Sequence, residues 1–160
     1  MRFGWLHLTD LHLGMDEQGS LLPALKDRFF EDLKSLHDKC GHWDLVIFSG
    51  DLTQSGKAEE FQKVDDFLGQ LWDRFQALGC QPSFLAVPGN HDLMRPNAKS
   101  AAVKALATWA TDLDVQSEFW NNPKSDYRST VETAFQHYQD WWAIAPRKPA
   151  TATALTWARP

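Results

Sequence analysis

The sequence has few cysteines, no long apolar run and no excess of positive charge. Its two cysteines, Cys40 and Cys80, lie 40 residues apart, which fits neither a disulfide framework nor a clustered zinc site. We therefore expect both thiols to be inert. No apolar run approaches the roughly 18 residues needed to span a bilayer, and the chain begins directly in a strand-like segment. We expect a cytoplasmic location and no membrane partner.

The charge balance is acidic, with 16 Lys and Arg against 21 Asp and Glu, a net charge of -5 and a pI near 5.6. No broad basic face is available to hold a polyphosphate backbone by counter-ion release. Nucleic acid is therefore a possible partner that the charge does not support. The 160 residues, of which 43% are hydrophobic, suffice for one compact globular domain or for part of a larger one.

Three short apolar runs, at residues 3–9, 44–49 and 83–87, have the length and residue types of buried strands. The two segments between them, 21–39 and 57–78, carry apolar residues at steps of three and four, which predicts a helix in each. Alternating strands and helices indicate an α/β fold with a parallel sheet, right-handed crossovers and flanking helical layers. The predicted stripes are Leu22, Leu25, Phe29, Leu33 and Leu36 in the first helix, and Phe61, Val64, Leu68, Leu71, Phe75 and Leu78 in the second.

The pattern changes after the third run. Segments 98–110 and 130–142 are predicted to be helices joined by a polar stretch, and the Pro/Ala/Thr-rich tail could be a short strand or an unpaired end. We expect a layered domain of which this chain is the amino-terminal half. Its parts are motif-bearing strand-helix units at 1–95, a helical insertion at 96–145 and an irregular tail at 146–160.

Polar clusters follow each predicted strand at once. Because parallel strands all point the same way, residues just beyond their carboxyl ends gather along one edge of the sheet. The intervals from Asp10 to Asp51 and from Asp51 to Asn90 are 41 and 39 residues, or one strand-helix unit each. We therefore expect the clusters to meet. They are Asp10 and His12 in TDLHLG, Asp51 in SGDLT, and Asn90, His91 and Asp92 in PGNHDL.

Carboxylates and imidazoles that converge in this way repel and desolvate one another unless cations neutralise them. A metal site is the simplest explanation. Mixed carboxylate, imidazole and amide donors suit manganese, iron or zinc, whereas an all-oxygen set would suit magnesium or calcium. Asp51 lies between the outer clusters and could bridge two ions. Gly50 and Gly89 precede ligands, where the missing Cβ permits sharp turns and close approach.

The three motifs D-x-H, G-D and G-N-H-D, each after a short strand, resemble those of the calcineurin-like metallophosphoesterase superfamily. The resemblance covers roughly residues 2–95. The longer segments WLHLTDLHLG, SGDLT and AVPGNHDL are similar to those of the amino-terminal phosphoesterase modules of large bacterial multidomain proteins. The resemblance implies two divalent transition-metal ions, with Mn²⁺ favoured and Fe or Zn as alternatives. The implied ligands are Asp10 and His12 for one ion, Asp51 for both and Asn90 for the other.

The activity implied by the resemblance is hydrolysis of a phosphomonoester or phosphodiester by a metal-bound hydroxide. His91 would assist the leaving group or stabilise the phosphoryl oxygen. Asp92 would orient His91 or its loop. Asn90 and His91 would contact the phosphoester substrate, and so could Arg95, for which a surface arginine without that task is the alternative. Neither the fold nor the metals select a phosphatase, phosphodiesterase or nuclease.

The match stops after the third motif. The superfamily adds histidines from later G-H and G-H-x-H segments, and the only histidine after His91 is His137, in a predicted helix. The second ion would keep only Asp51 and Asn90, too few to hold it firmly. One explanation is that the remainder of a longer polypeptide, or a partner subunit, completes the site. The other is a catalytically incomplete metal- or nucleotide-binding module for sensing or assembly in a larger protein.

Three further histidines are expected to be structural. His7 alternates with leucines inside the first run and is expected on a sheet face or in the interior. His37 and His42 flank the end of the first predicted helix, where an imidazolium is favoured by the negative end of the helix dipole.

Overall fold

The computed structural model describes residues 3–15 and 18–145, with side chains described from residue 25 in the second range. A parallel sheet in the order β1-β2-β3 is formed by β1 (Trp5–Leu8), β2 (Leu45–Phe48) and β3 (Ser83–Ala86). Its register aligns Trp5 with Leu45, and Leu45 with Ser83. These strands confirm the three predicted runs. The ambiguous tail, 146–160, lies outside the described residues.

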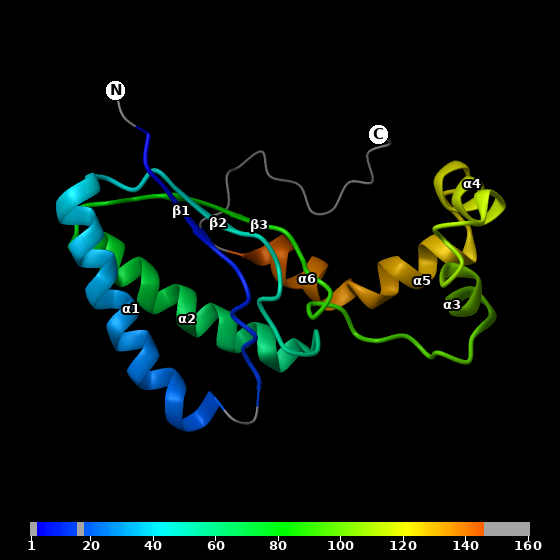
Figure 1. Cartoon of the computed structure of the whole chain (residues 1–160), viewed down its shortest axis with the longest axis horizontal. Coiled ribbons are helices and arrows are strands. Elements are labelled where there is room, and N and C mark those ends of the chain that lie inside the picture. The colour runs from blue at the N-terminus through cyan, green and yellow to red at the C-terminus, as the bar shows by residue number, and fades with distance from the viewer. Residues whose placement is uncertain (1–2, 16–17, 146–160) are drawn as a thin grey trace.

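Two long helices connect the strands, as the periodicity predicts. α1 (Gln18–Cys40) follows β1, and α2 (Ala58–Ala77) follows β2. Figure 1 shows both running along the same side of the sheet. They touch through aromatic rings, since Phe30 stacks on Phe67 with ring centroids 6.2 Å apart.

One face of the sheet forms the core. Val46, Phe48 and Phe84 point to this face and are completely buried. Phe84 packs against Trp72 of α2 and against Trp142 of a later helix, with ring centroids 5.5 and 5.6 Å away. Burial of such aromatic and branched side chains supplies most of the driving force for folding.

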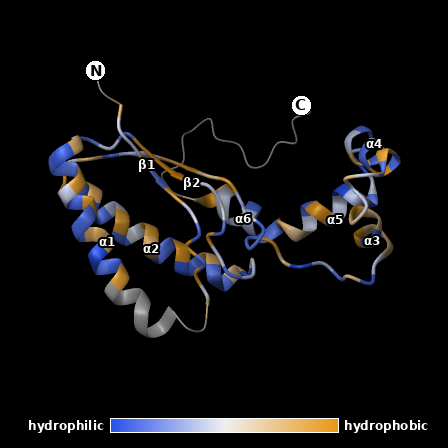
Figure 2. Ribbon diagram, viewed as in Figure 1, coloured by the Kyte–Doolittle hydropathy of each residue, from blue (hydrophilic) through white to orange (hydrophobic). Residues whose placement is uncertain are grey.

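The opposite face of the sheet is open among the described residues. Trp5 is 65% exposed and Leu85 38% exposed, while Leu45 and Ile47 are half-buried. His7 lies on this face and hydrogen-bonds to the Ser49 hydroxyl at 2.7 Å. Figure 2 shows hydrophobic residues along strands that no described helix covers from this side. The expectation of helical layers therefore holds for one face, because apolar strand residues do not reveal which face has a partner.

The stripe predicted for α2 is buried from Phe61 to Phe75. The stripe predicted for α1 is only partly correct, because Leu25 is 54% and Leu36 42% exposed, whereas Leu33 is buried. A helix as long as α1 extends about 35 Å, while a four-residue strand extends only about 13 Å. The two ends of α1 therefore project beyond the sheet that would cover them.

Up to residue 145, where the described part ends, the second half of the chain contains four short helices, where two longer ones were predicted at 98–110 and 130–142. Hydroxyl and carboxylate side chains start three of them, because Ser100, Asp112 and Ser125 accept hydrogen bonds from backbone N–H groups of the first turns. None of the described helices has the length and apolar character needed to cross a membrane. The helices are α3 (Ala101–Leu106), α4 (Leu113–Asn121), α5 (Asp126–Ala134) and α6 (Gln136–Ile144).

The last described helix, α6, returns to the sheet, whereas α3, α4 and α5 lie to one side (Figure 1). The Tyr138 hydroxyl donates to the Ala86 carbonyl at 2.8 Å, which joins α6 to the end of β3. Burial, together with the nearby negative charge of Asp92, raises the pKa of Tyr138, so this hydroxyl stays protonated. The Trp141 indole donates to Asp65 of α2 at 2.8 Å.

Candidate metal centre

The loops after β1 and β2 run side by side beyond the sheet. The Asp10 amide donates to the Gly50 carbonyl at 3.2 Å, and the His12 amide to the Asp51 carbonyl at 2.9 Å. An isolated parallel bridge between Leu13 and Thr53 continues the pairing. The first and second motifs are thereby fixed against each other through backbone hydrogen bonds.

Three of the predicted ligands adopt a left-handed backbone. Asp10, His12 and Asp51 have φ angles of 57°, 46° and 55°, and no other non-glycine residue in the described ranges has a positive φ. This conformation costs roughly 1–2 kcal/mol per residue for an L-amino acid, somewhat less for Asp. Such strain concentrates at functional sites, where the surrounding structure holds it. The sequence does not mark these positions as left-handed, because none of them is a glycine.

The side chains of these residues converge. His12 Nε2 lies 3.6 Å from Asp10 Oδ1 and 4.0 Å from Asp51 Oδ2. One potential ligand atom from each of the three lies within 4.8 Å of the others. These separations are too long for hydrogen bonds. They approach the roughly 3 to 3.5 Å expected between atoms that share one ion. The donor set therefore fits a divalent metal ion.

The Asp51 carboxylate lies between the first and third motifs. One oxygen faces His12, and the other accepts the His91 amide at 2.9 Å. Glycine makes this closeness possible, because a Cβ on Gly50 would lie 2.9 Å from the Gly89 Cα. The two glycines thus allow backbone to meet backbone, and their contact is with each other and with Asp51.

Asp92 is completely buried beneath the site. Its Oδ1 accepts from the Thr53 amide and hydroxyl at 2.8 and 2.9 Å. Its Oδ2 accepts from the amides of Gly89 and Leu52 at 2.9 and 3.2 Å. Asp92 thus joins the second-motif loop to the third-motif loop. Both of its carboxylate oxygens are used in these hydrogen bonds, so Asp92 does not act as a metal ligand.

His91 is oriented by the second-motif loop. Its Nδ1 lies 2.9 Å from the Gln54 carbonyl oxygen. Since a carbonyl can only accept, Nδ1 carries a hydrogen and Nε2 remains for other chemistry. The His91 ring meets the His12 ring edge to face, with centroids 4.6 Å apart. Gln54 could not be singled out from the sequence, because its role uses only the backbone carbonyl.

The fourth predicted ligand, Asn90, is exposed and lines a hollow of about 390 Å³. His91 and Arg95 line the same hollow. The structure therefore brings the three predicted substrate-binding residues to one depression beside the converging carboxylates.

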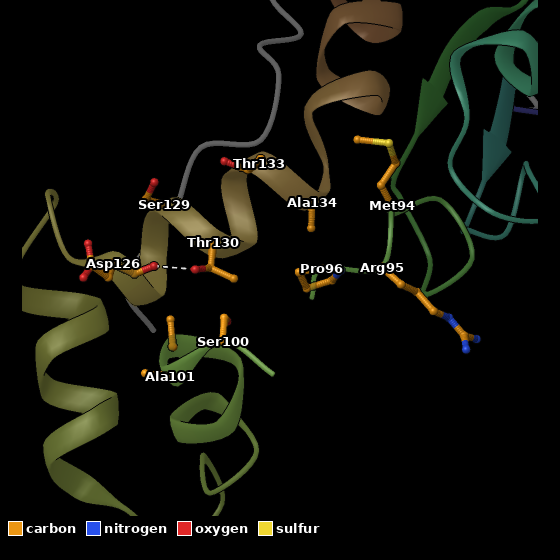
Figure 3. Close-up of a pocket in the computed structure, with 11 residues that line it drawn as sticks. Met94, Arg95, Pro96, Ser100, Ala101, Asp126, Ser129, Thr130, Thr133 and Ala134 are labelled. Atoms are coloured by element: carbon orange, nitrogen blue, oxygen red, sulfur yellow. Dashed lines mark hydrogen bonds between the residues drawn. The ribbon is translucent and has the colours of Figure 1, made fainter. Parts of the chain in front are cut away.

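A larger hollow, of about 610 Å³, lies between residues 94–96 and helices α3 and α5. Figure 3 shows the Arg95 side chain pointing away from it. The Thr130 hydroxyl in its wall is already bonded to the Asp126 carbonyl at 2.7 Å. We propose no catalytic or binding role for this hollow.

His137, the only histidine after the third motif, is not in this cluster. Its Nδ1 hydrogen-bonds to the Gly56 carbonyl at 2.8 Å, so the ring has a structural contact. Among the described side chains, a second group with metal-binding geometry consists of His37, His42 and Cys80. His37 and His42 are five residues apart, and Cys80 lies 38 residues beyond His42.

A family model described as calcineurin-like phosphoesterase matches residues 5–158. The chain belongs to this family. The match extends past the motif-bearing part and spans the helical second half, α3 to α6. Members are metal-dependent phosphoesterases, in keeping with the convergence of Asp10, His12 and Asp51. A search of curated proteins finds no match.

Proposed function

We propose that this phosphoesterase domain hydrolyses a phosphomonoester or phosphodiester at a two-metal site, with Mn²⁺ as the ion, in a larger multidomain bacterial protein. The observation that supports it best is the convergence of Asp10, His12 and Asp51 on a strained left-handed backbone. Strain of this kind persists where a geometry is needed for function. Asp10 and His12 would hold one ion, Asp51 would be shared and Asn90 would bind the second.

Bound divalent ions would supply charge neutralisation and activation of water for in-line attack at phosphorus. The chain's own residues prepare the site for them. The Asp51 oxygen that accepts the His91 amide is fixed in direction, which holds the other oxygen toward His12.

His91 would act as the general acid or as a donor to the phosphoryl oxygen. With Nδ1 hydrogen-bonded to the Gln54 carbonyl, the proton it can give is the one on Nε2. Nε2 carries that proton only when the ring is an imidazolium, so donation requires the charged form. Such catalysis contributes about 10²- to 10⁴-fold to a rate.

Arg95 and Asn90 would bind the substrate phosphate in the hollow they share with His91. Arg95 is exposed there and free to form a bidentate contact with phosphate oxygens. Asp92 would act as a positioning residue, because its four hydrogen bonds hold the loop that carries Asn90 and His91.

We further propose that this chain needs another segment or subunit for full activity. The proposed second ion has only Asp51 and Asn90, and His137 is occupied by the Gly56 carbonyl. The open sheet face supports the same proposal, since Trp5 and Leu85 are apolar and exposed there, and Leu45 and Ile47 between them are only half-buried. Parallel sheets normally have both faces covered. The covering segment would supply the missing histidines.

The alternative, a metal- or nucleotide-binding sensing or assembly module without turnover, rests on the same shortage of ligands. The two are separated by measuring Mn²⁺-dependent hydrolysis of bis-p-nitrophenyl phosphate by the longest natural polypeptide that contains this sequence. We expect Asp51→Asn to lower the rate at least about 100-fold, comparable with the loss of a catalytic group. Asp66→Asn, an exposed α2 position, is the matched control and should keep the rate.

Equal rates in the wild type and Asp51→Asn would exclude hydrolysis at this site. Mn²⁺ binding lost in Asp51→Asn without turnover in any form would favour the sensing module. Isothermal titration of the 160-residue chain with Mn²⁺ measures that binding independently of activity.

A further inference from the structure

A second group of potential metal ligands lies at the end of the sheet opposite the phosphoesterase site. A ring nitrogen of His37, a ring nitrogen of His42 and the Cys80 sulfur lie within 4.8 Å of one another. His37 is in the last turn of α1, His42 precedes β2 and Cys80 precedes β3. A four-residue strand, about 13 Å long, separates the two ends.

Not every polar atom of this group has a hydrogen-bond partner. His42 Nδ1 lies 3.1 Å from Cys80 Sγ, while His37 Nδ1 is buried without a hydrogen-bond partner. The nearest carboxylate oxygen with a measured distance, Asp38 Oδ1, is 3.8 Å from that nitrogen, beyond hydrogen-bonding range. A buried polar atom without a partner points to an unseen water or ion.

The donor types select the ligand. Two imidazoles and one thiolate suit a borderline or soft ion such as Zn²⁺ and disfavour Mg²⁺ or Ca²⁺. Nitrogen and sulfur atoms about 2.0–2.3 Å from one tetrahedral ion lie roughly 3.3–3.8 Å apart. Side-chain shifts of about 1 Å would bring the present separations to that geometry.

The burial of the three side chains also favours binding of an ion. Cys80 is 2% exposed, His37 is half-buried and His42 is exposed, so the group has a dry inner side and an open outer side. An ion could enter past His42. Its fourth position would remain open to water, as in zinc sites with three protein ligands.

We propose that His37, His42 and Cys80 form a second metal site, which binds Zn²⁺ and ties α1 to the amino ends of β2 and β3. When the ion binds, the Cys80 thiol gives its proton to solvent, the sulfur–metal bond forms, and both histidines bind as neutral rings. The site is independent of phosphoester hydrolysis. Sequence spacing does not predict the site, because Cys80 lies 38 residues beyond His42 and meets the two histidines only through tertiary packing.

Co²⁺, a spectroscopic substitute for Zn²⁺, tests this on the 160-residue chain. A thiolate bound to Co²⁺ gives a charge-transfer band in the near ultraviolet, which the oxygen and nitrogen ligands around Asp51 cannot produce. We expect the band to saturate at one ion per chain and to disappear when Zn²⁺ is added. Cys80→Ser should abolish it. Cys40→Ser, which removes the exposed cysteine, and Asp51→Asn, which alters the other centre, should retain it.

A band that is absent in the wild type, or that survives in Cys80→Ser and is lost in Cys40→Ser, overturns the proposal. Because Cys80 is buried and its variant could misfold, His42→Gln provides a second test at an exposed position. It should weaken Co²⁺ binding at least about tenfold, since even an outer partner of a metal ligand contributes about 10- to 100-fold. Unchanged affinity in His42→Gln would leave a hydrogen-bonded His–Cys pair as the correct description.

Discussion

Thr53 and Asp92, 39 residues apart in the sequence, are both completely buried and are joined twice. Asp92 Oδ1 accepts from the Thr53 amide at 2.8 Å and from its hydroxyl at 2.9 Å. This pair connects the loops that carry the second and third motifs. The geometry of the candidate centre therefore depends on a carboxylate that is itself outside the proposed ligand set.

Asp92→Asn should destabilise the fold and loosen the centre together. The amide has one oxygen in place of two, so at least one buried donor loses a charged acceptor, which costs about 1.5–3 kcal/mol. Urea denaturation measures the loss of unfolding free energy, and Mn²⁺ titration measures the loss of binding. Asp66→Asn on the surface of α2 should change neither. If Asp92→Asn is as stable as the wild type, the proposed positioning role is wrong.

Gly50→Ala should be destabilising by about 1–3 kcal/mol, the range for a residue forced into a sparsely populated backbone region. Gly50 has φ of 115°, and a Cβ there would meet the Gly89 Cα at 2.9 Å. Gly69→Ala is the matched control, because Gly69 is inside α2 and a Cβ there meets nothing within 4 Å. That variant should be more stable than the wild type by about 0.5–1 kcal/mol. Thermal unfolding measures both changes. A Gly50→Ala variant at least as stable as the wild type would contradict the prediction.

Glu60 should give the fold an acid-sensitive contribution. Burial, the largest influence, raises its pKa, but hydrogen bonds from the Ser55 hydroxyl and amide and the Lys57 amide and charge outweigh it, so the pKa is below the ordinary 4.5. A lowered folded-state pKa means that the contribution is complete above pH 4.5 and is lost as pH falls through the folded value.

The difference in unfolding free energy between the wild type and Glu60→Gln isolates this effect from the other carboxylates. It should be constant near neutrality and shrink in acid. Circular dichroism is the control and should show the same secondary structure in Glu60→Gln as in the wild type. A difference that grows on acidification would show that the sign is wrong.

His91→Gln should lower kcat of the longest natural polypeptide by about 10²- to 10⁴-fold while leaving Mn²⁺ affinity unchanged. The separation is expected because His91 is assigned to the leaving group or phosphoryl oxygen and is outside the ligand set. His42→Gln, at the end of the sheet opposite the phosphoesterase site, is the histidine control and should keep the full rate. Loss of Mn²⁺ binding in His91→Gln would instead make His91 a ligand.

The sheet, α1 and α2 could be predicted because hydrophobic periodicity reports local structure directly. The meeting of Asp10, His12 and Asp51 could be predicted because parallel strands fix where their carboxyl ends lie. The short α4 was missed because nine residues carry too few apolar positions to show a period. The exposed sheet face was missed because Leu45 and Ile47 read as buried whether or not a partner covers them.

The left-handed residues and the His37, His42 and Cys80 group were invisible for another reason. A positive φ angle is a property of the folded backbone, and in a sequence a glycine is its main indicator. Cys80 joins the two histidines only when tertiary packing brings β3 beside β2.

The strained backbone at Asp10, His12 and Asp51 sets stability and chemistry against each other. Replacing Asp10 or His12 with glycine would relax the chain and raise its melting temperature, while removing a donor atom from the centre, whereas the same change at Asp51 would also remove the acceptor of the His91 amide. Laboratory evolution for heat resistance alone would therefore discard these side chains first. Anyone who engineers a sturdier version of this domain should keep those positions fixed.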